Sequence, residues 1–549
     1  MMQGGRLPVR RPGHAVPAMK SIPALLLGLG IGLAPAAAMA VNTEAPEPAP
    51  TASTIAQASA AGGEPATPVD DERGFVHGFR FGGYARTWAS WNLEDHPEIP
   101  QRSAGSLQML RGSLSLNAEA TTGPLKWKAI GRADKEVNTS YQRDLEEANR
   151  RNSPGGPGSN LMKQYDKAEL RELYVDMDPT ERVHLRLGKQ QVVWGETDFF
   201  HPTDLIHGFD YRWRSFLESD NDELRKPLWL INAKIDVPEA DGSLQLVLRP
   251  GIDRERDIGN SYDLYGGRWA AQPYKGVDFL APGFLNYDRR HPAGDTHNPT
   301  GGLRWTGLAG PVNYAVSYLK TYKPDPVVNS AFAPYQKAPT GGLGDFIFPK
   351  MDVYDVSVSG QIPGLDAVVT GEVAYQRNVA YNVGSNFMNG ALPGFGGIIR
   401  KDAVLTTLRF DKQLRLMEWL GTNQASFFSV QVFDTWLPGY KRSDDIVEQV
   451  GFGARLREHT TLITSFIQLN YLNSRLNPGL AVGMDVTNGD AFVIPSVSFQ
   501  IGNHWRLLAE ANLFFPKHTR KPGQVESSTH TLGDFARNSQ FMLRATYQF

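Results

Sequence analysis

The stretch Phe541-Met-Leu-Arg-Ala-Thr-Tyr-Gln-Phe549 decides the fold. In an extended chain its residues alternate between two faces, and Leu543, Ala545 and Tyr547 share one face with the two terminal phenylalanines. Aromatic residues stand at both ends of this apolar row, as they would at the two interfaces of a bilayer. The stretch therefore predicts a β-strand. Alone, it fits either the last strand of a membrane barrel or the last strand of a soluble sandwich.

Composition leaves both architectures open. The chain has 549 residues, no cysteine, 55 glycines, 37 prolines, 10% aromatic and 21% charged residues. Its mean hydropathy is −0.35, and outside the N-terminal region no apolar run reaches the ~20 residues that a spanning helix needs. A low average does not exclude a membrane, because only alternate residues of a barrel strand face lipid.

The first seventy residues predict export. An apolar run over 22–33 follows four basic residues and precedes Ala38-Met39-Ala40, which predicts a secretory signal over 1–40. The alternative, a membrane anchor, is disfavoured because the run is short. Removing the four basic residues shifts the formal charge from −2 to −6, so nucleic acid is not an expected partner. Residues 41–73 are rich in Ala, Pro, Thr and Glu and predict a disordered periplasmic leader before a barrel over 74–549.

Alternating apolar rows recur along the rest of the chain, in pairs joined by short turns such as Thr122-Gly123-Pro124. The clearest rows are 110–120, 125–134, 183–187, 229–235, 244–248, 312–318, 369–375, 450–456 and 505–513. The short turns all fall on one side of the pattern, and long connections such as 135–167, 197–226 and 253–297 fall on the other. Short turns at one rim and long loops at the other are typical of outer-membrane barrels.

The predicted fold is all-β: a transmembrane antiparallel up-and-down β-barrel of about 18 strands (16 to 20), with long extracellular loops and possible segments inside the lumen. The final strand should pair with the strand near 75–91 and close the barrel, with a bulge or kink at Gly82-Gly83. The aromatic residues expected in the interfacial girdles are Trp127, Trp229, Trp305, Tyr318, Tyr375 and Trp505.

The stretch 186–214 breaks the alternation, because aromatic residues and paired charges follow Trp194 instead of small polar loop residues. We expect it to fold into the lumen as a constriction, with Glu196 and Asp198 paired to interior cations. The candidate residues are Arg186, Lys189, Trp194, Glu196, Asp198, Phe199, Phe200, Asp204, Arg212 and Arg214. The rings expected to line an apolar path are Trp194, Phe199, Phe200, Phe209, Tyr211 and Trp213. The alternative is a packed extracellular loop that only caps the barrel.

Two further features are weaker. The spacing of His201, Asp204 and His207 would suit metal ligands on a helix, but Pro202 interrupts any such helix, so neither a metal nor a cofactor is predicted. The aromatic-rich stretch 253–297 is a second candidate for the lumen, or else a surface loop that meets lipopolysaccharide.

Three blocks carry a resemblance to a known family: Leu-Arg-Leu-Gly-Lys-Gln at 185–190, Val-Trp-Gly-Glu at 193–196, and the aromatic, Asp-rich stretch 198–205. They resemble the proteobacterial outer-membrane barrels classed as a domain of unknown function, the family numbered 1302. The resemblance implies the outer membrane of a Gram-negative bacterium and the export or uptake of hydrophobic compounds. The final strand also resembles the signature recognised by the barrel-assembly machinery, which implies that Tyr547 and Phe549 act in assembly.

The predicted function is a channel or transporter for a hydrophobic or amphipathic small molecule. The alternative is an accessory barrel of an envelope export system, with a periplasmic or inner-membrane partner. A hydrolase is a distant third, because no Gly-x-Ser-x-Gly motif is present, so no catalytic residue is predicted. Membrane lipids and lipopolysaccharide are the other expected partners.

The interior of the barrel should carry mixed charge without clear anion selectivity. The charged residues on inward rows are Arg111, Lys126, Lys128, Arg132, Arg186, Lys234, Arg249 and Arg544, with Glu119, Glu172, Asp236 and Glu510.

Overall fold

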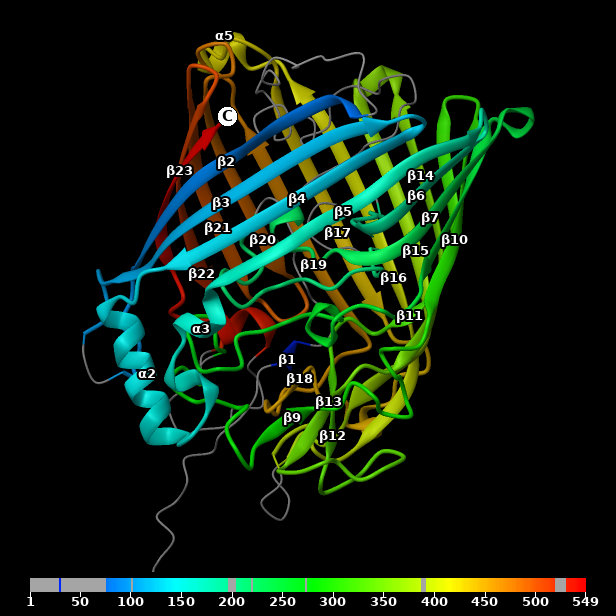
Figure 1. Ribbon diagram of the computed structural model, residues 1–549. Helices are drawn as coiled ribbons and strands as arrows, with labels where there is room; N and C mark the ends of the chain where they lie inside the picture. Colours follow the sequence, from blue (N-terminus) through cyan, green and yellow to red (C-terminus); the bar gives the residue numbers. More distant parts are fainter. Residues whose placement is uncertain are drawn as a thin grey trace, which may run out of the picture.

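A closed antiparallel barrel of 18 strands forms most of the computed structural model (Figure 1). The structure describes residues 29–30, 76–99, 102–195, 204–218, 221–271, 274–386, 392–518 and 530–549. The predicted fold class and strand number are confirmed. The predicted signal sequence and leader lie outside the described residues, apart from 29–30.

Each wall strand pairs with the next wall strand along the chain, and the last pairs with the first. The wall strands are β2 (Val76–Asn92), β3 (Leu107–Thr122), β4 (Leu125–Glu136), β5 (Lys167–Thr180), β6 (Val183–Gln190), β7 (Leu228–Val237), β8 (Gly242–Arg249), β10 (Thr300–Ala309), β11 (Val312–Tyr322), β14 (Lys350–Ile362), β15 (Ala367–Asn382), β16 (Ile398–Leu414), β17 (Ser426–Trp436), β19 (His459–Gln468), β20 (Leu476–Asp485), β21 (Ala491–Ile501), β22 (Trp505–Phe515) and β23 (Gln540–Gln548).

The remaining elements lie in the connections. The small strands are β1 (Leu29–Gly30), which pairs with β18 (Gln449–Val450), and β9 (Leu285–Tyr287), β12 (Val327–Ser330) and β13 (Gly344–Ile347), which form a separate three-stranded sheet. The helices are α2 (Ser140–Asn152), α3 (Met162–Tyr165), α4 (Asn221–Leu224) and α5 (Met417–Leu420). The 3-10 turns are η1 (Pro157–Ser159), η2 (Pro238–Ala240), η3 (Glu255–Asp257), η4 (Pro363–Leu365), η5 (Arg442–Asp444) and η6 (Thr531–Phe535).

The two faces of the wall distinguish a membrane barrel from a soluble sandwich. On β3, Arg111 and Ser113 point inward and are 2% and 7% exposed, whereas Leu114 and Leu116 point outward and are 42% and 39% exposed. A soluble sandwich would bury the apolar row and hydrate the polar one. Here the polar row is inside and the apolar row is outside, as a strand with lipid around it requires.

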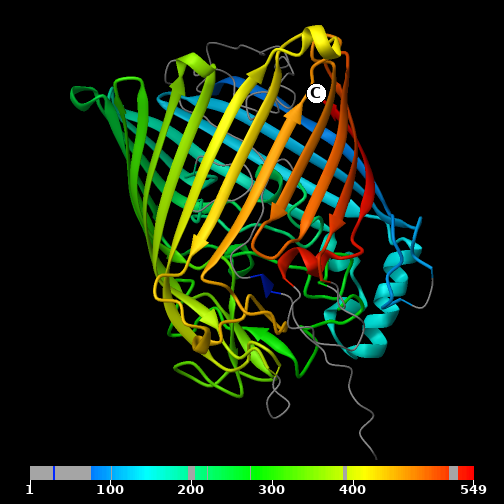
Figure 2. The ribbon, with the colours of Figure 1, turned by 180° about the vertical axis from the view of Figure 1, so that it is seen from behind.

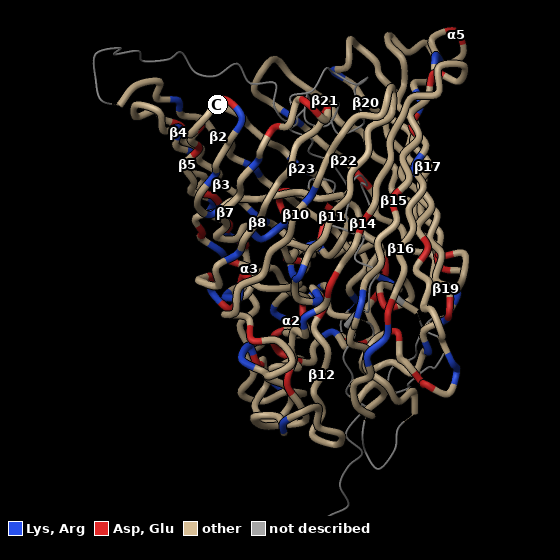
Figure 3. Tube along the Cα trace, turned by 90° about the vertical axis from the view of Figure 1, so that its right-hand side faces the viewer, with Lys and Arg blue, Asp and Glu red and all other residues tan. Residues whose placement is uncertain are grey.

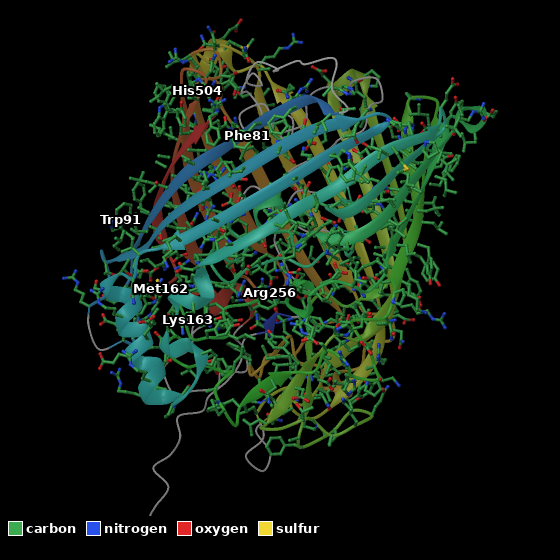
Figure 4. All side chains as sticks on the ribbon, in the orientation of Figure 1. Phe81, Trp91, Met162, Lys163, Arg256 and His504 are labelled. Carbon is green, nitrogen blue, oxygen red and sulfur yellow. The ribbon has the colours of Figure 1, made fainter. Side chains whose placement is uncertain are left out.

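The two rims also differ as expected. Two-residue to eleven-residue turns, including α5, join strands at the rim where the chain ends, and the long connections gather at the other rim (Figures 1 and 2). Acidic and basic residues lie close together around α2 and the long connections, while long stretches of the wall are uncharged (Figure 3). On β2, Phe81 lies toward the short-turn rim and Trp91 toward the long-loop rim (Figure 4). His504 lies at the short-turn rim. The predicted girdle residues Trp127, Tyr375 and Trp505 are 41%, 37% and 45% exposed.

Closure joins β23 to β2, as predicted. Their register runs from Tyr84 opposite Gln548 to Asn92 opposite Gln540. Beyond it, the Phe549 nitrogen donates to the Gly83 oxygen at 3.0 Å, and the Gly83 nitrogen donates to the Phe549 oxygen at 2.9 Å.

The bulge predicted at Gly82-Gly83 is wrong in position. The β2–β3 register shifts instead between His77 and Arg80, where Gly78 has φ +61°, and between Ser90 and Trp91. Gly82 and Gly83 remain in regular register, and their lack of side chains leaves room for Phe549 and the Ser115 carbonyl.

The strand predicted over 450–456 is also wrong, since only Gln449–Val450 forms the short β18 and the wall strands on either side are β17 and β19. Val450, Phe452 and Ala454 are at most 1% exposed, and Gly451 and Gly453 between them are buried too. The row is therefore packed on both sides within the loops and does not face lipid.

Candidate functional site

The connection between β6 and β7 crosses the interior of the barrel. It leaves the wall at Gln190 and returns at Leu228, and its described parts are 191–195, 204–218 and 221–227. We call residues 204–218 and 221–227 the crossing segment. Of the predicted site residues, Glu196, Asp198, Phe199 and Phe200 lie outside the described residues, as does His201.

Glu223 on α4 fixes one end of the crossing segment to the wall. Its Oε1 accepts hydrogen bonds from Tyr84 Oη at 2.7 Å and Arg86 Nη1 at 2.8 Å, both on β2. Its Oε2 accepts from Arg132 Nη1 on β4 at 2.5 Å. Burial opposes ionisation of this carboxyl, but the charges of Arg132 and Arg86 prevail and hold its pKa well below the ordinary value. The segment is thus held by a charged network that spans two strands.

Arg214 and Glu218 form a second anchor. The Arg214 guanidinium pairs with Glu218 and with Glu510 on β22, and Arg544 Nη1 on β23 donates to Glu218 Oε1 at 3.2 Å. Arg214 is 1% exposed and Glu218 is fully buried. Burial acts to raise the pKa of Glu218, but Arg214 and Arg544 lower it, so the carboxylate stays charged. The two anchors together connect β22, β23, β2 and β4 across the seam where the barrel closes.

Phe216 gives the segment an apolar anchor further round the wall. Its ring lies 6.1 Å from that of Phe492 on β21 and 6.0 Å from that of Phe514 on β22. Leu217 packs in the same cluster, which also contains Phe433 of β17 and Leu462 of β19. From β6, the wall passes β5, β4, β3, β2, β23 and β22 before it reaches β21. The segment therefore reaches a part of the wall far from the strands that carry it.

The predicted cations each have a carboxylate partner among the described residues. Arg186 Nε donates to Asp176 at 2.6 Å, and Lys189 Nζ lies 3.4 Å from Asp257. Arg212 Nη2 lies 2.7 Å from Asp210. The predicted Asp204 accepts from Arg225 Nη2 at 2.8 Å. Sequence reasoning missed Glu218 and Glu223, which neither spacing nor neighbouring residues distinguish from ordinary loop acids. It also missed Glu136, which alternation could have found, because Glu136 continues the inward row of Arg132 and Asp134 on β4.

The aromatic residues of the segment are packed. Phe209, Tyr211 and Trp213 are 3–5% exposed, and Trp194 is 1% exposed. The Trp213 ring meets Trp88 of β2 edge-on at 5.3 Å, and Trp194 Nε1 donates to Gln245 of β8 at 2.9 Å. These described rings therefore fill space between the segment and the wall.

The connection between β8 and β10, the second predicted candidate, braces the crossing segment. Arg268 donates two bonds to Glu136 of β4, at 2.6 and 2.7 Å, and its Nε donates to the Trp213 oxygen at 3.1 Å. Trp269 packs 6.0 Å from Phe535. The β8–β10 connection is thus joined to the crossing segment and, through Trp269, to the β22–β23 connection.

His207, considered as a metal ligand, has both ring nitrogens engaged by the backbone. Its Nε2 accepts from the Val192 nitrogen at 2.9 Å, and its Nδ1 donates to the Lys226 oxygen at 3.0 Å. Burial lowers its pKa to about 4, so the ring is neutral. Among the residues that the structure describes, no three His, Asp or Glu side chains are grouped to hold a metal ion.

Within the described residues no helix combines the length and hydrophobicity needed to cross a membrane.

An 18-stranded barrel with an apolar exterior and a charged interior defines the structural class. The chain belongs to the family described as "Protein of unknown function (DUF1302)", whose model matches residues 22–549. No curated protein matches it.

Three solved structures have some similarity to this chain. OccAB1 of Acinetobacter baumannii is 10% identical, with a TM-score of 0.42 over 88% of this chain and 99% of that one. OpdK of Pseudomonas aeruginosa, solved with vanillate, is 8% identical, with a TM-score of 0.42 over 86% and 98%. The outer membrane channel DcaP of Acinetobacter baumannii is 10% identical, with a TM-score of 0.36 over 88% and 100%.

Proposed function

We propose that this protein is a channel in the outer membrane of a Gram-negative bacterium, reached by export with a cleaved signal peptide. It passes a small hydrophobic or amphipathic solute. The observation that supports this function best is the crossing segment, which runs through an 18-stranded barrel and is fixed by buried charges to inward-facing residues of the wall. A barrel of this size encloses a lumen too wide to be filled by wall side chains alone, so an inserted segment determines what passes.

The kind of solute follows from the charges and rings of the interior. Nearly every inward-facing cation of the described network has a carboxylate partner, as in Arg132 with Glu223 and Arg111 with Glu136. Balanced charges give little selection for anions or cations. When the crossing segment shifts, Phe209, Tyr211 and Trp213 are the surfaces that it uncovers, and they suit an apolar or amphipathic solute.

Glu223→Gln tests the constriction. The substitution keeps the shape of the side chain but removes the charge that holds Arg86 and Arg132, and breaking a buried ion pair costs about 3–5 kcal/mol. We expect a larger and noisier single-channel conductance in planar bilayers. Glu239→Gln is the matched control, because Glu239 pairs with Arg182 at 2.7 Å on an exposed turn. Wild-type conductance from a folded Glu223→Gln barrel would contradict the constriction.

A second candidate function, an accessory barrel of an envelope export system, is favoured by one observation. Trp419 on α5 is 87% exposed at the short-turn rim, and Leu420 and Leu472 beside it are 48% and 56% exposed. The Tyr471 hydroxyl bonds the Leu420 oxygen at 3.0 Å, so these two turns are adjacent. Apolar surface of this kind suits a periplasmic partner protein. Solute flux in proteoliposomes containing only this protein would favour the channel over the accessory.

A further inference from the structure

The outer face of the wall is hollowed where the barrel closes. A cavity of about 740 Å³ lies over β22, β23, β2, β3, β4 and β5. The strand register arranges its lining in two neighbouring rows across these strands. The first row is Trp505, Tyr547, Ala85, Leu114, Ala133 and Ala168; the second continues through Ala545, Thr87, Gly112, Lys135 and Asp166.

Small side chains form the floor of this groove. Ala85, Thr87, Gly112 and Ala133 point outward at positions where most of the outer wall carries large apolar residues. On the wall of β14 to β16, for comparison, Val358, Val373 and Leu408 are 45%, 47% and 54% exposed. The groove is therefore a local depression in a surface that lipid covers elsewhere.

The two ends of the groove differ in chemistry. Trp505 and Tyr547, with ring centroids 5.1 Å apart, form the end at the short-turn rim. Lys135, whose side chain is 79% exposed, forms the end at the long-loop rim, where its ammonium pairs with Asp166. Figure 4 shows Met162 and Lys163 of α3 next to this end of the wall.

The surface around the Lys135 end has an excess of basic side chains, with Lys135 paired to Asp166 and Arg151 paired to Glu147. Between residues 135 and 166 the exposed basic side chains are Lys135, Arg143, Arg150, Arg151 and Lys163, and the exposed acidic side chain is Glu147. The other acids of this stretch are buried or half-buried, such as Glu136, which pairs with Arg111 and Arg268. An anionic headgroup is the complementary partner for such a surface.

The groove is long enough for one acyl chain. It crosses five spacings between strands, or about 24 Å at about 4.8 Å each. Its two ends lie at the two rims, and a chain that enters at Lys135 occupies only the part in the nearer leaflet, which is half of the hydrocarbon thickness of about 30 Å. A single acyl chain that starts at Lys135 therefore has room to run to the middle of the bilayer.

We propose that this groove binds lipid A, the phosphorylated and acylated anchor of lipopolysaccharide, with one acyl chain over Ala133, Gly112 and Thr87 and a phosphate beside Lys135. The basic end lies at the rim of the long loops, which places the headgroup in the outer leaflet. The site depends on the barrel spanning a membrane, but not on what passes through the lumen.

Gly112→Leu tests the site by filling the groove. A Cβ on Gly112 would approach no atom closer than the Lys135 oxygen at 4.0 Å, so the strand tolerates a side chain there. Gly371→Leu is the matched control, because Gly371 also points outward from a strand and a Cβ there meets nothing within 4 Å. Ala133→Leu fills the same groove from β4 and repeats the test if Gly112→Leu fails to fold.

The measurement is native mass spectrometry of the full barrel after incubation with purified lipid A and competing phosphatidylglycerol. We expect one tightly retained lipid A on the wild type and on Gly371→Leu, and at least tenfold less on Gly112→Leu and Ala133→Leu. Lys135→Gln should weaken retention less than groove filling does. Equal retention by all variants, or retention of phosphatidylglycerol in place of lipid A, would overturn the proposal. Conductance should be unchanged in Gly112→Leu, so this test and the constriction test fail independently.

Discussion

At the scale of single residues, Gly83 and Phe549 depend on each other for closure. A Cβ on Gly83 would lie 2.1 Å from the Ser115 oxygen and 3.2 Å from the Phe549 ring. Gly83→Ala must therefore displace β2 from β3 or from the end of β23, and overpacking of this kind destabilises by about 1–3 kcal/mol. We expect a smaller fraction of heat-modifiable, folded barrel on electrophoresis. Gly112→Ala is the control, and equal folded fractions for both variants would show that the close approach at Gly83 is dispensable.

Residue chemistry inside the barrel was predictable in part. Period-two alternation put Arg132, Glu510 and Arg544 on inward rows, and the structure uses all three in the two anchors. Their partners Glu218 and Glu223 could not be predicted, because they lie in a loop. Which acid meets which arginine depends on how the crossing segment folds inside the closed wall, and strand periodicity carries no information about that path.

At the scale of elements, alternation predicted the wall strands and failed where both faces are packed. The row over 450–456 has the same period as a wall strand, but its second face holds two buried glycines and Arg455, which pairs with Asp445 in a neighbouring loop. Periodicity reports that two faces differ, and does not report what each face meets. The bulge predicted at Gly82 and Gly83 was wrong for a related reason. These glycines let Phe549 and the Ser115 carbonyl approach the backbone closely, and the strand register does not change there.

Phe216 is the apolar anchor of the crossing segment, and its removal tests whether this element is held as a unit. Phe216 is 5% exposed and contacts Phe492, Phe514 and Phe535. Truncating a buried phenylalanine costs about 3–5 kcal/mol. We expect Phe216→Ala to make the segment more accessible to protease while the barrel stays closed. Phe332→Ala is the control, because Phe332 is 48% exposed. Identical digestion of the two variants would mean that the charged anchors alone hold the segment.

At the scale of the whole molecule, the fold is determined by the need to pair every polar backbone group inside the membrane. Hydrocarbon leaves no backbone group unpaired, so the strands must close on themselves, and the first and last strands must meet. The final strand predicted that closure, and the asymmetry of turns predicted the two rims. The packing of the long connections against one another was less predictable, because connections from distant parts of the wall, such as the β8–β10 and β22–β23 connections, meet only after closure.

His530 joins the β22–β23 connection to the β17–β19 connection, and this contact should depend on pH. Its Nδ1 pairs with Glu448 of the β17–β19 connection, and Asp485 and Asp490 also face the ring. Burial acts to lower the pKa of His530, but the bond and charge of Glu448, with the two aspartates, raise it above the ordinary 6.5. Because the pKa of His530 is raised in the folded state, the ion pair stabilises the contact between the two connections fully below about pH 6.5. This stabilisation is lost as the pH rises through the pKa of His530 in the folded protein.

Limited trypsin digestion should detect that loss. Arg537 is exposed in the same connection as His530, so cleavage there reports when the connection detaches. For the wild type we expect cleavage at Arg537 to accelerate as the pH is raised from 6 to 9, after correction for the activity of trypsin itself. His530→Gln cannot carry the charge, so its cleavage should be fast and nearly independent of pH. The same pH profile in both proteins would show that other groups hold the β22–β23 connection to its neighbour, since Glu448 would then gain nothing from the protonated ring.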